Sequence, residues 1–179
     1  MELNGETLRF IREHCKDDVR SLALQAPKYP GVDMPVALTQ IAGRQAAAEK
    51  IPSWHEEEGV LYPRHLSLEQ CSSEATARYK ASIIPGSSSG TLTDLTGGFG
   101  IDCAFLSPRF HHVTYVERQE VLCEIASHNF PLLGLNHIRI ENKDGIRHLQ
   151  ERSSVDWIFI DPARPGMRKK AFYIPVTYR

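Results

Sequence analysis

The stretch Asp94-Leu-Thr-Gly-Gly-Phe-Gly-Ile-Asp102 decides the fold of this 179-residue chain. It follows a short run of strand-forming residues that begins at Thr91, and it leads into a helical pattern that runs to Leu106. Glycines let a backbone turn sharply and let a ligand approach without a Cβ in the way. A helix that follows such a turn points its N-terminal amides at the ligand. The stretch therefore predicts a ligand-binding turn between a strand and a helix.

Short strand-like runs alternate with helical patterns on the C-terminal side of this turn. The expected strands are residues 91–95, 112–116, 138–141 and 155–160. Helical patterns at 101–106, 121–126 and 145–151 separate them. This β-α alternation predicts an α/β fold, in which a parallel sheet carries helices on both faces.

Residues 1–84 follow a different rhythm, because their apolar residues recur at steps of three and four, which predicts a helical N-terminal region. Within it, Ser67-Leu-Glu-Gln70 fits a capping box and predicts a helix that begins there and runs to about Ala81. Pro85-Gly-Ser-Ser-Ser-Gly90 is a flexible stretch, and we place a domain boundary in it. The expected units are therefore residues 1–84 and 91–179.

The composition is that of an ordinary soluble globular protein, with 41% hydrophobic and 24% charged residues. No apolar run approaches the length that crosses a bilayer, so no membrane partner is expected. The four cysteines lack the spacing of zinc ligands and indicate free thiols in a reducing cytoplasm, where we expect the protein. The net charge of −1 gives no bulk electrostatic argument for a nucleic-acid partner. Five basic residues and no acidic one follow Pro162, and we interpret them as a solvated tail rather than a phosphate-facing patch.

The glycine spacing in the turn indicates the kind of ligand. A dinucleotide-binding loop reads Gly-x-Gly-x-x-Gly, whereas Gly97, Gly98 and Gly100 are too closely spaced to cradle a pyrophosphate. A cofactor without phosphates fits better, and an NAD-dependent oxidoreductase is a weak alternative. A tight turn with no ligand remains the structural alternative.

Acidic residues stand at the expected strand ends, where open α/β sheets bind their ligands. Asp94 can accept a hydrogen bond or pair with a cationic amino group, and Glu117 is placed to accept from both hydroxyls of a ribose. Asp144 could accept from the exocyclic amine of adenine, could cap the following helix, or could do both. Each of these residues also has a purely structural interpretation, but their order at successive strand ends favours a binding site.

The last expected strand is followed by Asp161-Pro-Ala-Arg164, which holds the candidate catalytic residues. Asp161 could orient or deprotonate a nucleophilic nitrogen. Pro162 would stiffen the turn, and Arg164 could contact a substrate phosphate. A strand terminator followed by a loop is the alternative.

Residues 91–166 resemble the class I, Rossmann-like methyltransferases that depend on S-adenosylmethionine (SAM). The stretch 94–102 resembles their motif I, Glu117 matches the acid that holds the ribose, and Asp144 matches the acid that often contacts adenine. The resemblance implies SAM as the cofactor, with Asp94 and Thr96 at the polar ends of its methionine part. Its glycine turn would surround that part with Gly97, Gly98 and Gly100.

The stretch Asp161-Pro-Ala-Arg164 matches motif IV of that family and is closest to the RNA 5-methyluridine methyltransferases. The resemblance implies methyl transfer to a base of rRNA or tRNA, with RNA as the partner. Those enzymes also use a later nucleophilic cysteine and a later general base, and no residue follows Arg179. Residues 38–45 and 62–74 look like a group of bacterial SAM-dependent methyltransferases with a THUMP-like extension.

In that family further strands follow the fourth, and the strands expected here give the order 3-2-1-4. The chain stops 18 residues after Asp161 (179 − 161), so we expect a Rossmann-like core truncated after motif IV, with its C-terminal strands missing. A truncated, non-catalytic binding module and a small-molecule or protein methyltransferase remain alternatives. An open sheet edge at the fourth strand would invite pairing with a second chain, which makes a homodimer a reasonable expectation.

Overall fold

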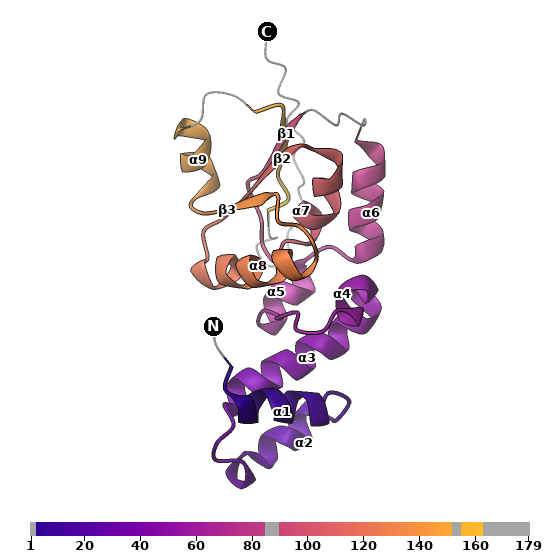
Figure 1. Cartoon of the computed structure of the whole chain (residues 1–179), viewed down its shortest axis with the longest axis vertical. Helices are drawn as coiled ribbons and strands as arrows, with labels where there is room; N and C mark the ends of the chain where they lie inside the picture. Colours follow the sequence, from indigo (N-terminus) through magenta and orange to yellow (C-terminus); the bar gives the residue numbers. More distant parts are fainter. Residues whose placement is uncertain (1–2, 85–89, 152–154, 163–179) are drawn as a thin grey trace, which may run out of the picture.

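The computed structural model describes residues 3–84, 90–151 and 155–162, and it shows an elongated molecule (Figure 1). The helical region comprises α1 (Gly5–Glu13), α2 (Val19–Leu24), the 3-10 turn η1 (Ala26–Lys28), α3 (Met34–Lys50), α4 (Pro52–Glu56), α5 (His65–Gln70) and α6 (Glu74–Ile83). The α/β region comprises β1 (Thr91–Asp94), α7 (Ile101–Leu106), the 3-10 turn η2 (Ser107–Arg109), β2 (His112–Glu117), α8 (Glu120–Leu132), β3 (Ile138–Asn142), α9 (Gly145–Glu151) and β4 (Trp157–Phe159).

The strands of the described residues form one parallel sheet in the order β3-β2-β1-β4. This order confirms the expected α/β fold and its strand arrangement 3-2-1-4. In the register, Asp94 lies opposite Tyr115 of β2 and Phe159 of β4. Because the strands are parallel, their carboxyl ends meet at one edge of the sheet, which is where this architecture places ligands.

Helices cover the sheet from two directions. In Figure 1, α6 and α7 lie to one side of the strands and α9 lies to the other. α8 packs against β2 and β3, and α6 packs against α7. α6 precedes the glycine turn in sequence, and by packing on α7 it joins the helices on this side of the sheet. It thereby brings the helical region close to the strand ends.

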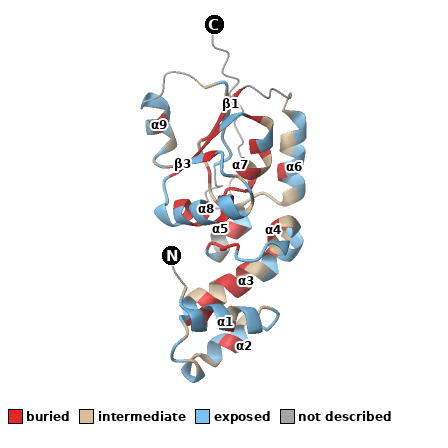
Figure 2. Cartoon of the chain, viewed as in Figure 1, coloured by how far each residue is buried: buried red, intermediate tan, exposed pale blue. Residues whose placement is uncertain are grey.

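The apolar core spans the two regions of the chain, as the buried residues in Figure 2 indicate. The larger cluster contains Ile51, Trp54 and Tyr62 from the helical region together with Leu92 and Phe99 from the α/β region. A smaller cluster holds α1, α2 and α3 together through Phe10, Leu22, Met34, Ala37 and Ile41. The expected boundary at 85–90 lies almost wholly outside the described residues, so the division into 1–84 and 91–179 stays a prediction.

Two buried amide side chains fix an extended segment between the regions. The Asn129 side chain accepts from the Leu61 backbone N–H and donates to the Leu61 carbonyl, at 2.9 Å each. Gln40 forms the same pair of bonds with Tyr62, at 2.8 and 2.9 Å. Each amide satisfies backbone groups that would otherwise be buried without a partner. The segment is therefore held rigidly between α3 and α8, and it carries the Tyr62 ring toward Phe99 of the glycine turn, with ring centroids 6.1 Å apart.

The predicted helix from Ser67 to Ala81 is wrong, because the chain forms two helices there. Ser67 lies inside α5, which ends at Gln70, and α6 begins at Glu74. The cap of α6 is Ser73, whose Oγ accepts from the Thr76 backbone N–H at 3.3 Å. Both serines suit a cap by residue type, but α5 already begins at His65, so Ser67 lies within a helix and Ser73 begins the next one.

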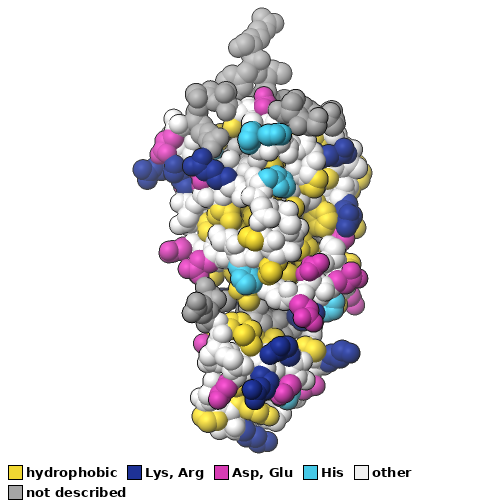
Figure 3. All heavy atoms as spheres, in the orientation of Figure 1, with side chains coloured by type: hydrophobic (Ala, Val, Ile, Leu, Met, Phe, Trp, Pro, Cys, Tyr) yellow, Lys and Arg dark blue, Asp and Glu magenta, His cyan; other side chains and the backbone are white. Residues whose placement is uncertain are grey.

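The described residues contain no helix that is both long and apolar enough to cross a membrane. On the face shown in Figure 3, acidic and basic side chains are interspersed rather than gathered by sign. This view agrees with the near-neutral net charge of −1.

Candidate functional site at the carboxyl edge of the sheet

Asp94 ends β1 and is 1% exposed. Its Oδ1 accepts from the Thr96 backbone N–H at 2.9 Å and from Thr96 Oγ1 at 3.4 Å, whereas its Oδ2 is buried with no partner among the described residues. Burial raises the pKa of the Asp94 carboxyl to about 7, and the charges of Asp102 and Glu117 act in the same direction against the hydrogen bonds from Thr96. A cationic group beside Oδ2 would satisfy this oxygen and stabilise the ionised form.

The glycines of the turn have a packing reason as well as a possible role in binding. A Cβ on Gly97 would lie 2.3 Å from the ring of Tyr115, and a Cβ on Gly100 would lie 2.9 Å from the ring of Phe130. Gly98 and Gly100 have φ values of +55° and +90°, which side-chain-bearing residues rarely adopt. The Tyr115 hydroxyl donates to the Gly98 carbonyl at 2.6 Å. The turn is therefore fixed by the strand and helix behind it.

Glu117 ends β2, is 8% exposed and faces the glycine turn. Its Oε2 accepts from the Gly98 backbone N–H at 2.9 Å, and its Oε1 accepts from the Gln119 backbone N–H at 2.8 Å. Its carbonyl accepts from Asn142 Nδ2 at 2.9 Å and from the Lys143 backbone N–H at 3.0 Å. Glu117 thus ties together the loops after β1, β2 and β3. Since a carboxylate oxygen can accept more than one hydrogen bond, both oxygens retain capacity for a ligand hydroxyl.

Asp144 lies in the loop after β3 and is exposed. Its Oδ1 accepts from the backbone N–H groups of Ile146 and Arg147, at 3.0 and 3.1 Å, so it caps the start of α9. A Cβ on the next residue, Gly145, would lie 2.7 Å from the Leu95 carbonyl oxygen. The loop after β3 therefore lies directly against the loop after β1. The helix-cap interpretation of Asp144 is confirmed, and its adenine-binding role stays a prediction.

Thr96 links the first strand end to the last. Its Oγ1 accepts from the Asp161 backbone N–H at 2.7 Å, while the same hydroxyl is 3.4 Å from Asp94 Oδ1. The structure thus brings Asp94, Thr96 and Asp161 together, although the sequence places them in separate motifs. Pro162 is exposed beside them, and Arg164 lies outside the described residues.

Lys80 of α6 is a charged residue of this edge that sequence reasoning missed. Its Nζ lies 2.7 Å from Asp161 Oδ2, 3.0 Å from Asp102 Oδ2 and 2.9 Å from Ser72 Oγ. Burial lowers the pKa of Lys80, but the hydrogen bonds to Asp161 and Asp102 outweigh it and leave the pKa raised. No spacing or motif in the sequence marks this lysine, because the contact joins residues 81 positions apart.

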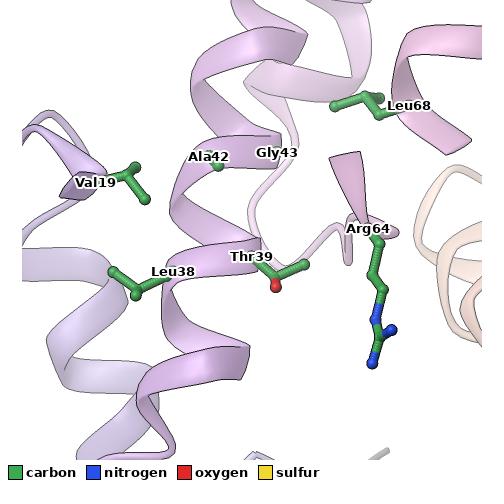
Figure 4. A pocket seen from close by; sticks show the side chains of 7 residues that line it. All are labelled: Val19, Leu38, Thr39, Ala42, Gly43, Arg64 and Leu68. Atoms are coloured by element: carbon green, nitrogen blue, oxygen red, sulfur yellow. The ribbon is translucent and has the colours of Figure 1, made fainter. Parts of the chain in front are cut away.

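Two cavities lie away from this edge. One of about 240 Å³ is lined by residues of α2 and α3 together with Arg64 and Leu68 (Figure 4), and another of about 440 Å³ lies where α4, α6, α7 and α8 approach one another. The lining of the first carries one charged side chain, Arg64, and neither lining includes a residue of the strand-end site. The described residues also contain no cluster of three or more His, Cys, Asp or Glu side chains that could hold a metal ion.

The strand ends together present one arrangement. A buried carboxylate oxygen with no partner among the described residues lies at the start of a rigid glycine turn. A second carboxylate faces that turn, and a third lies next to a lysine at the outer end. This arrangement suits a ligand that carries a cationic group and a pair of hydroxyls.

No protein-family model matches the sequence, and a comparison with curated proteins found no match. Among solved structures, the chain is similar to one from Porphyromonas gingivalis described as a presumed methyltransferase, with 27% identity and a TM-score of 0.64 over 84% of this chain and 38% of that one. It is also similar to the C-terminal domain of a precorrin-6Y methyltransferase from Rhodobacter capsulatus, with 15% identity and a TM-score of 0.48 over 54% of this chain and 53% of that one. A third similar structure is an rRNA methylase from Streptococcus thermophilus, with 22% identity and a TM-score of 0.35 over 42% of this chain and 45% of that one.

The first of these similarities, together with the strand order, confirms the Rossmann-like fold of the methyltransferases. The chain spans less than half the length of the Porphyromonas gingivalis structure.

Proposed function

We propose that this chain is a methyltransferase that uses SAM and acts on a base of rRNA or tRNA. The observation that carries the proposal is the buried Asp94 Oδ2, which has no partner among the described residues and lies at the start of the glycine turn that Glu117 faces. S-adenosylmethionine is the cofactor expected for this fold, since it is the methyl donor of the SAM-dependent methyltransferases that the sequence resembles.

The residues present fit this cofactor. Asp94 Oδ2 would accept from its ammonium group, Glu117 would accept from its ribose hydroxyls, and the turn at Gly97 and Gly98 would lie along its methionine part. Asp144 would accept from its adenine through the carboxylate that also caps α9. When bound, SAM supplies an electrophilic methyl group on a positively charged sulfur.

Asp161 would act on the acceptor. Its Oδ2 pairs with Lys80, and its Oδ1 has no hydrogen-bond partner among the described residues. Oδ1 could therefore accept a hydrogen bond from the acceptor group and hold it in line with the methyl. Pro162 would stiffen this loop, and we keep Arg164 as a candidate contact to RNA phosphate.

The RNA target rests on Asp161-Pro-Ala-Arg164 rather than on charge, because acidic side chains outnumber basic ones at the strand ends. A neutral base fits beside these carboxylates better than a phosphate does. We also propose that the protein is cytoplasmic and forms a homodimer. Sedimentation of the 179-residue chain tests the dimer.

Calorimetric titration with SAM and with S-adenosylhomocysteine tests the cofactor. We expect both ligands to bind the 179-residue chain. Asp94→Asn should bind at least tenfold more weakly, since a hydrogen bond to a charged group contributes about 1.5–3 kcal/mol. Glu124→Gln, which changes an exposed acid on α8, should bind as the wild type does. Absence of heat and of any thermal shift at millimolar ligand would overturn the proposal.

Transfer of a labelled methyl group tests the acceptor. The wild-type chain is incubated with labelled SAM and total rRNA or tRNA, and label in RNA is the expected result. Label in protein or in small molecules instead would replace RNA by those acceptors. Cofactor binding with no transfer to any of the three would favour the non-catalytic binding module.

A further inference from the structure

Lys80 joins three segments that lie far apart in the sequence. It extends from α6 of the helical region to Asp102 in the first turn of α7 and to Asp161 after β4. Ser72 completes the cluster, because its Oγ donates to Asp102 Oδ2 at 2.8 Å and lies 2.9 Å from Lys80 Nζ. The cluster is thus a polar contact between the helical region and the strand-end site, in addition to the ring packing of Tyr62 on Phe99.

The cluster differs from an ordinary surface ion pair. The side chains of Lys80 and Asp102 are 23% and 14% exposed, and Nζ has three oxygen partners at 2.7–3.0 Å. Exposed pairs between flexible side chains contribute little, because water screens them and they lose side-chain entropy. Here Lys80 is partly shielded, lies over the ring of Phe159 at 5.2 Å and is held by Asp102 from a second direction. The ammonium group is therefore held in place before it meets Asp161.

The geometry has a consequence for Asp161, whose side chain is 55% exposed. Its backbone is anchored by the bond from its N–H to Thr96 Oγ1, but nothing on its own loop among the described residues restrains the carboxylate. The Lys80 ammonium binds Oδ2, and this fixes the direction in which Oδ1 points.

We propose that Lys80 is a positioning residue of the acceptor side, which orients the Asp161 carboxylate so that Oδ1 is presented to the acceptor. This role rests on the proposed methyl transfer. It also means that the helical region supplies part of the site, in addition to covering the sheet. The charged and titratable groups that face the pair are Asp102 on α7 and, through Thr96, Asp94 at the end of β1.

The first test measures the ion pair itself, without any activity. The carbon-13 resonance of the Asp161 side-chain carboxylate is recorded at pH 7 in the 179-residue chain and in Lys80→Met, and it is assigned through Asp161→Asn. Because Lys80 donates a charged hydrogen bond to Oδ2, its removal is expected to move this resonance and to make the side chain more mobile. The control is Arg78→Met, two residues earlier on α6, where the guanidinium pairs with Glu74 instead. An unchanged Asp161 resonance and an unchanged mobility in Lys80→Met would overturn the proposal.

The second test measures methyl transfer from labelled SAM to total tRNA or rRNA, together with SAM affinity. We expect Lys80→Met to lower kcat about tenfold or more while the Kd for SAM stays within about twofold. We expect Lys80→Arg to recover most of the rate, because a guanidinium group can keep the charged hydrogen bond to Asp161. The double variant Lys80→Met with Asp161→Asn should be no slower than Asp161→Asn alone, which separates positioning from damage to the fold.

The outcomes separate this proposal from the proposed function. A changed Asp161 resonance in Lys80→Met with an unchanged rate would show that the ion pair exists and would overturn its positioning role. A wild-type chain that neither binds SAM nor transfers methyl would overturn the proposed function, and the positioning role with it, whatever the NMR spectra showed. Equal losses of SAM affinity and rate in Lys80→Met would assign the lysine to cofactor binding and overturn its role on the acceptor side.

Discussion

The two ends of the candidate site are built in different ways. The cofactor side, made of Asp94, the glycine turn 97–100 and Glu117, is largely buried and is held by backbone hydrogen bonds and ring packing. The acceptor side, made of Asp161 and Lys80, is more exposed and is held by charge. Shape therefore fixes the cofactor side, whereas electrostatics fixes the acceptor side. Substitutions that change side-chain volume should damage the cofactor side. Substitutions that change charge or hydrogen bonding should affect SAM binding and methyl transfer to different extents.

The largest effect is expected from Gly97→Ala. The new methyl group would lie 2.3 Å from the rigid ring of Tyr115, so the turn or the ring must move. Overpacking of this kind costs up to about 3 kcal/mol of unfolding free energy, and urea unfolding would measure it. The matched control is Gly5→Ala, since a Cβ there meets no atom within 4 Å. Equal unfolding free energies for Gly97→Ala and Gly5→Ala would show that the glycine turn adapts to an added methyl group. The cofactor side would then not be fixed by shape.

The fold was accessible from the sequence because its signals are local. The expected strands 91–95 and 112–116 correspond to Thr91–Asp94 and His112–Glu117, and the last expected strand shortens to Trp157–Phe159. Alternation of apolar residues and glycine turns carries this information within a few residues of chain. The start of α6 was missed because Ser67 and Gln70 fit the capping box, whereas Ser73 caps α6 without a glutamate or glutamine three residues later.

A smaller effect, on binding rather than folding, is expected from Glu117→Gln. The neutral amide would form weaker hydrogen bonds with the ribose hydroxyls. Its NH2 group would also face a backbone N–H, of Gly98 or Gln119, that now donates to the Glu117 carboxylate. Loss of a charged hydrogen-bond acceptor costs about 1.5–3 kcal/mol, which is roughly a 10- to 100-fold rise in the Kd for SAM. Calorimetry on this variant and on Glu124→Gln provides the comparison. A Kd within twofold of wild type would show that this carboxylate does not face the cofactor.

The pH dependence of SAM binding should give about a tenfold change. Asp94 has a pKa of about 7 in the folded chain against its ordinary 3.8, so the side chain is largely protonated at pH 6 and ionised at pH 8. If the ammonium group of SAM needs the ionised form, affinity rises about tenfold between these values. Asp94→Asn should bind weakly at both pH values.

The same carboxyl predicts the opposite trend for the chain without ligand. Its raised pKa means that the folded state holds a proton that the unfolded chain has released between about pH 4 and pH 7. The contribution of Asp94 to stability is therefore fully present below pH 4 and is lost as the pH rises through 7. Chemical unfolding of wild type and Asp94→Asn across this window measures the difference. A parallel pH trend in both would rule out Asp94 as the titrating group.

The candidate site divides along the same line as the fold. The strand-end acids and the glycines could be predicted because the topology of a parallel sheet brings strand ends to one edge. The partner of Asp161 could not be predicted. Lys80 lies on α6, and the packing of α6 on α7 brings it to this edge of the sheet. Tyr115 was missed for a related reason, because in the sequence it reads as one more apolar strand residue, and its hydroxyl bond to Gly98 depends on three-dimensional placement.

The smallest effect is expected where the two sides meet, at Thr96. Thr96→Val keeps the shape of the side chain but removes the hydroxyl that accepts from the Asp161 backbone N–H, at a cost of about 1 kcal/mol in unfolding free energy. Because the Thr96 backbone N–H still donates to Asp94, the Kd for SAM should stay within about twofold while labelled methyl transfer falls several-fold. Thr96→Ser, which keeps the hydroxyl, should transfer at nearly the wild-type rate. If Thr96→Val weakened SAM binding as much as it slowed transfer, the hydroxyl would serve both sides at once, and the division between shape and charge would fail at the residue that joins them.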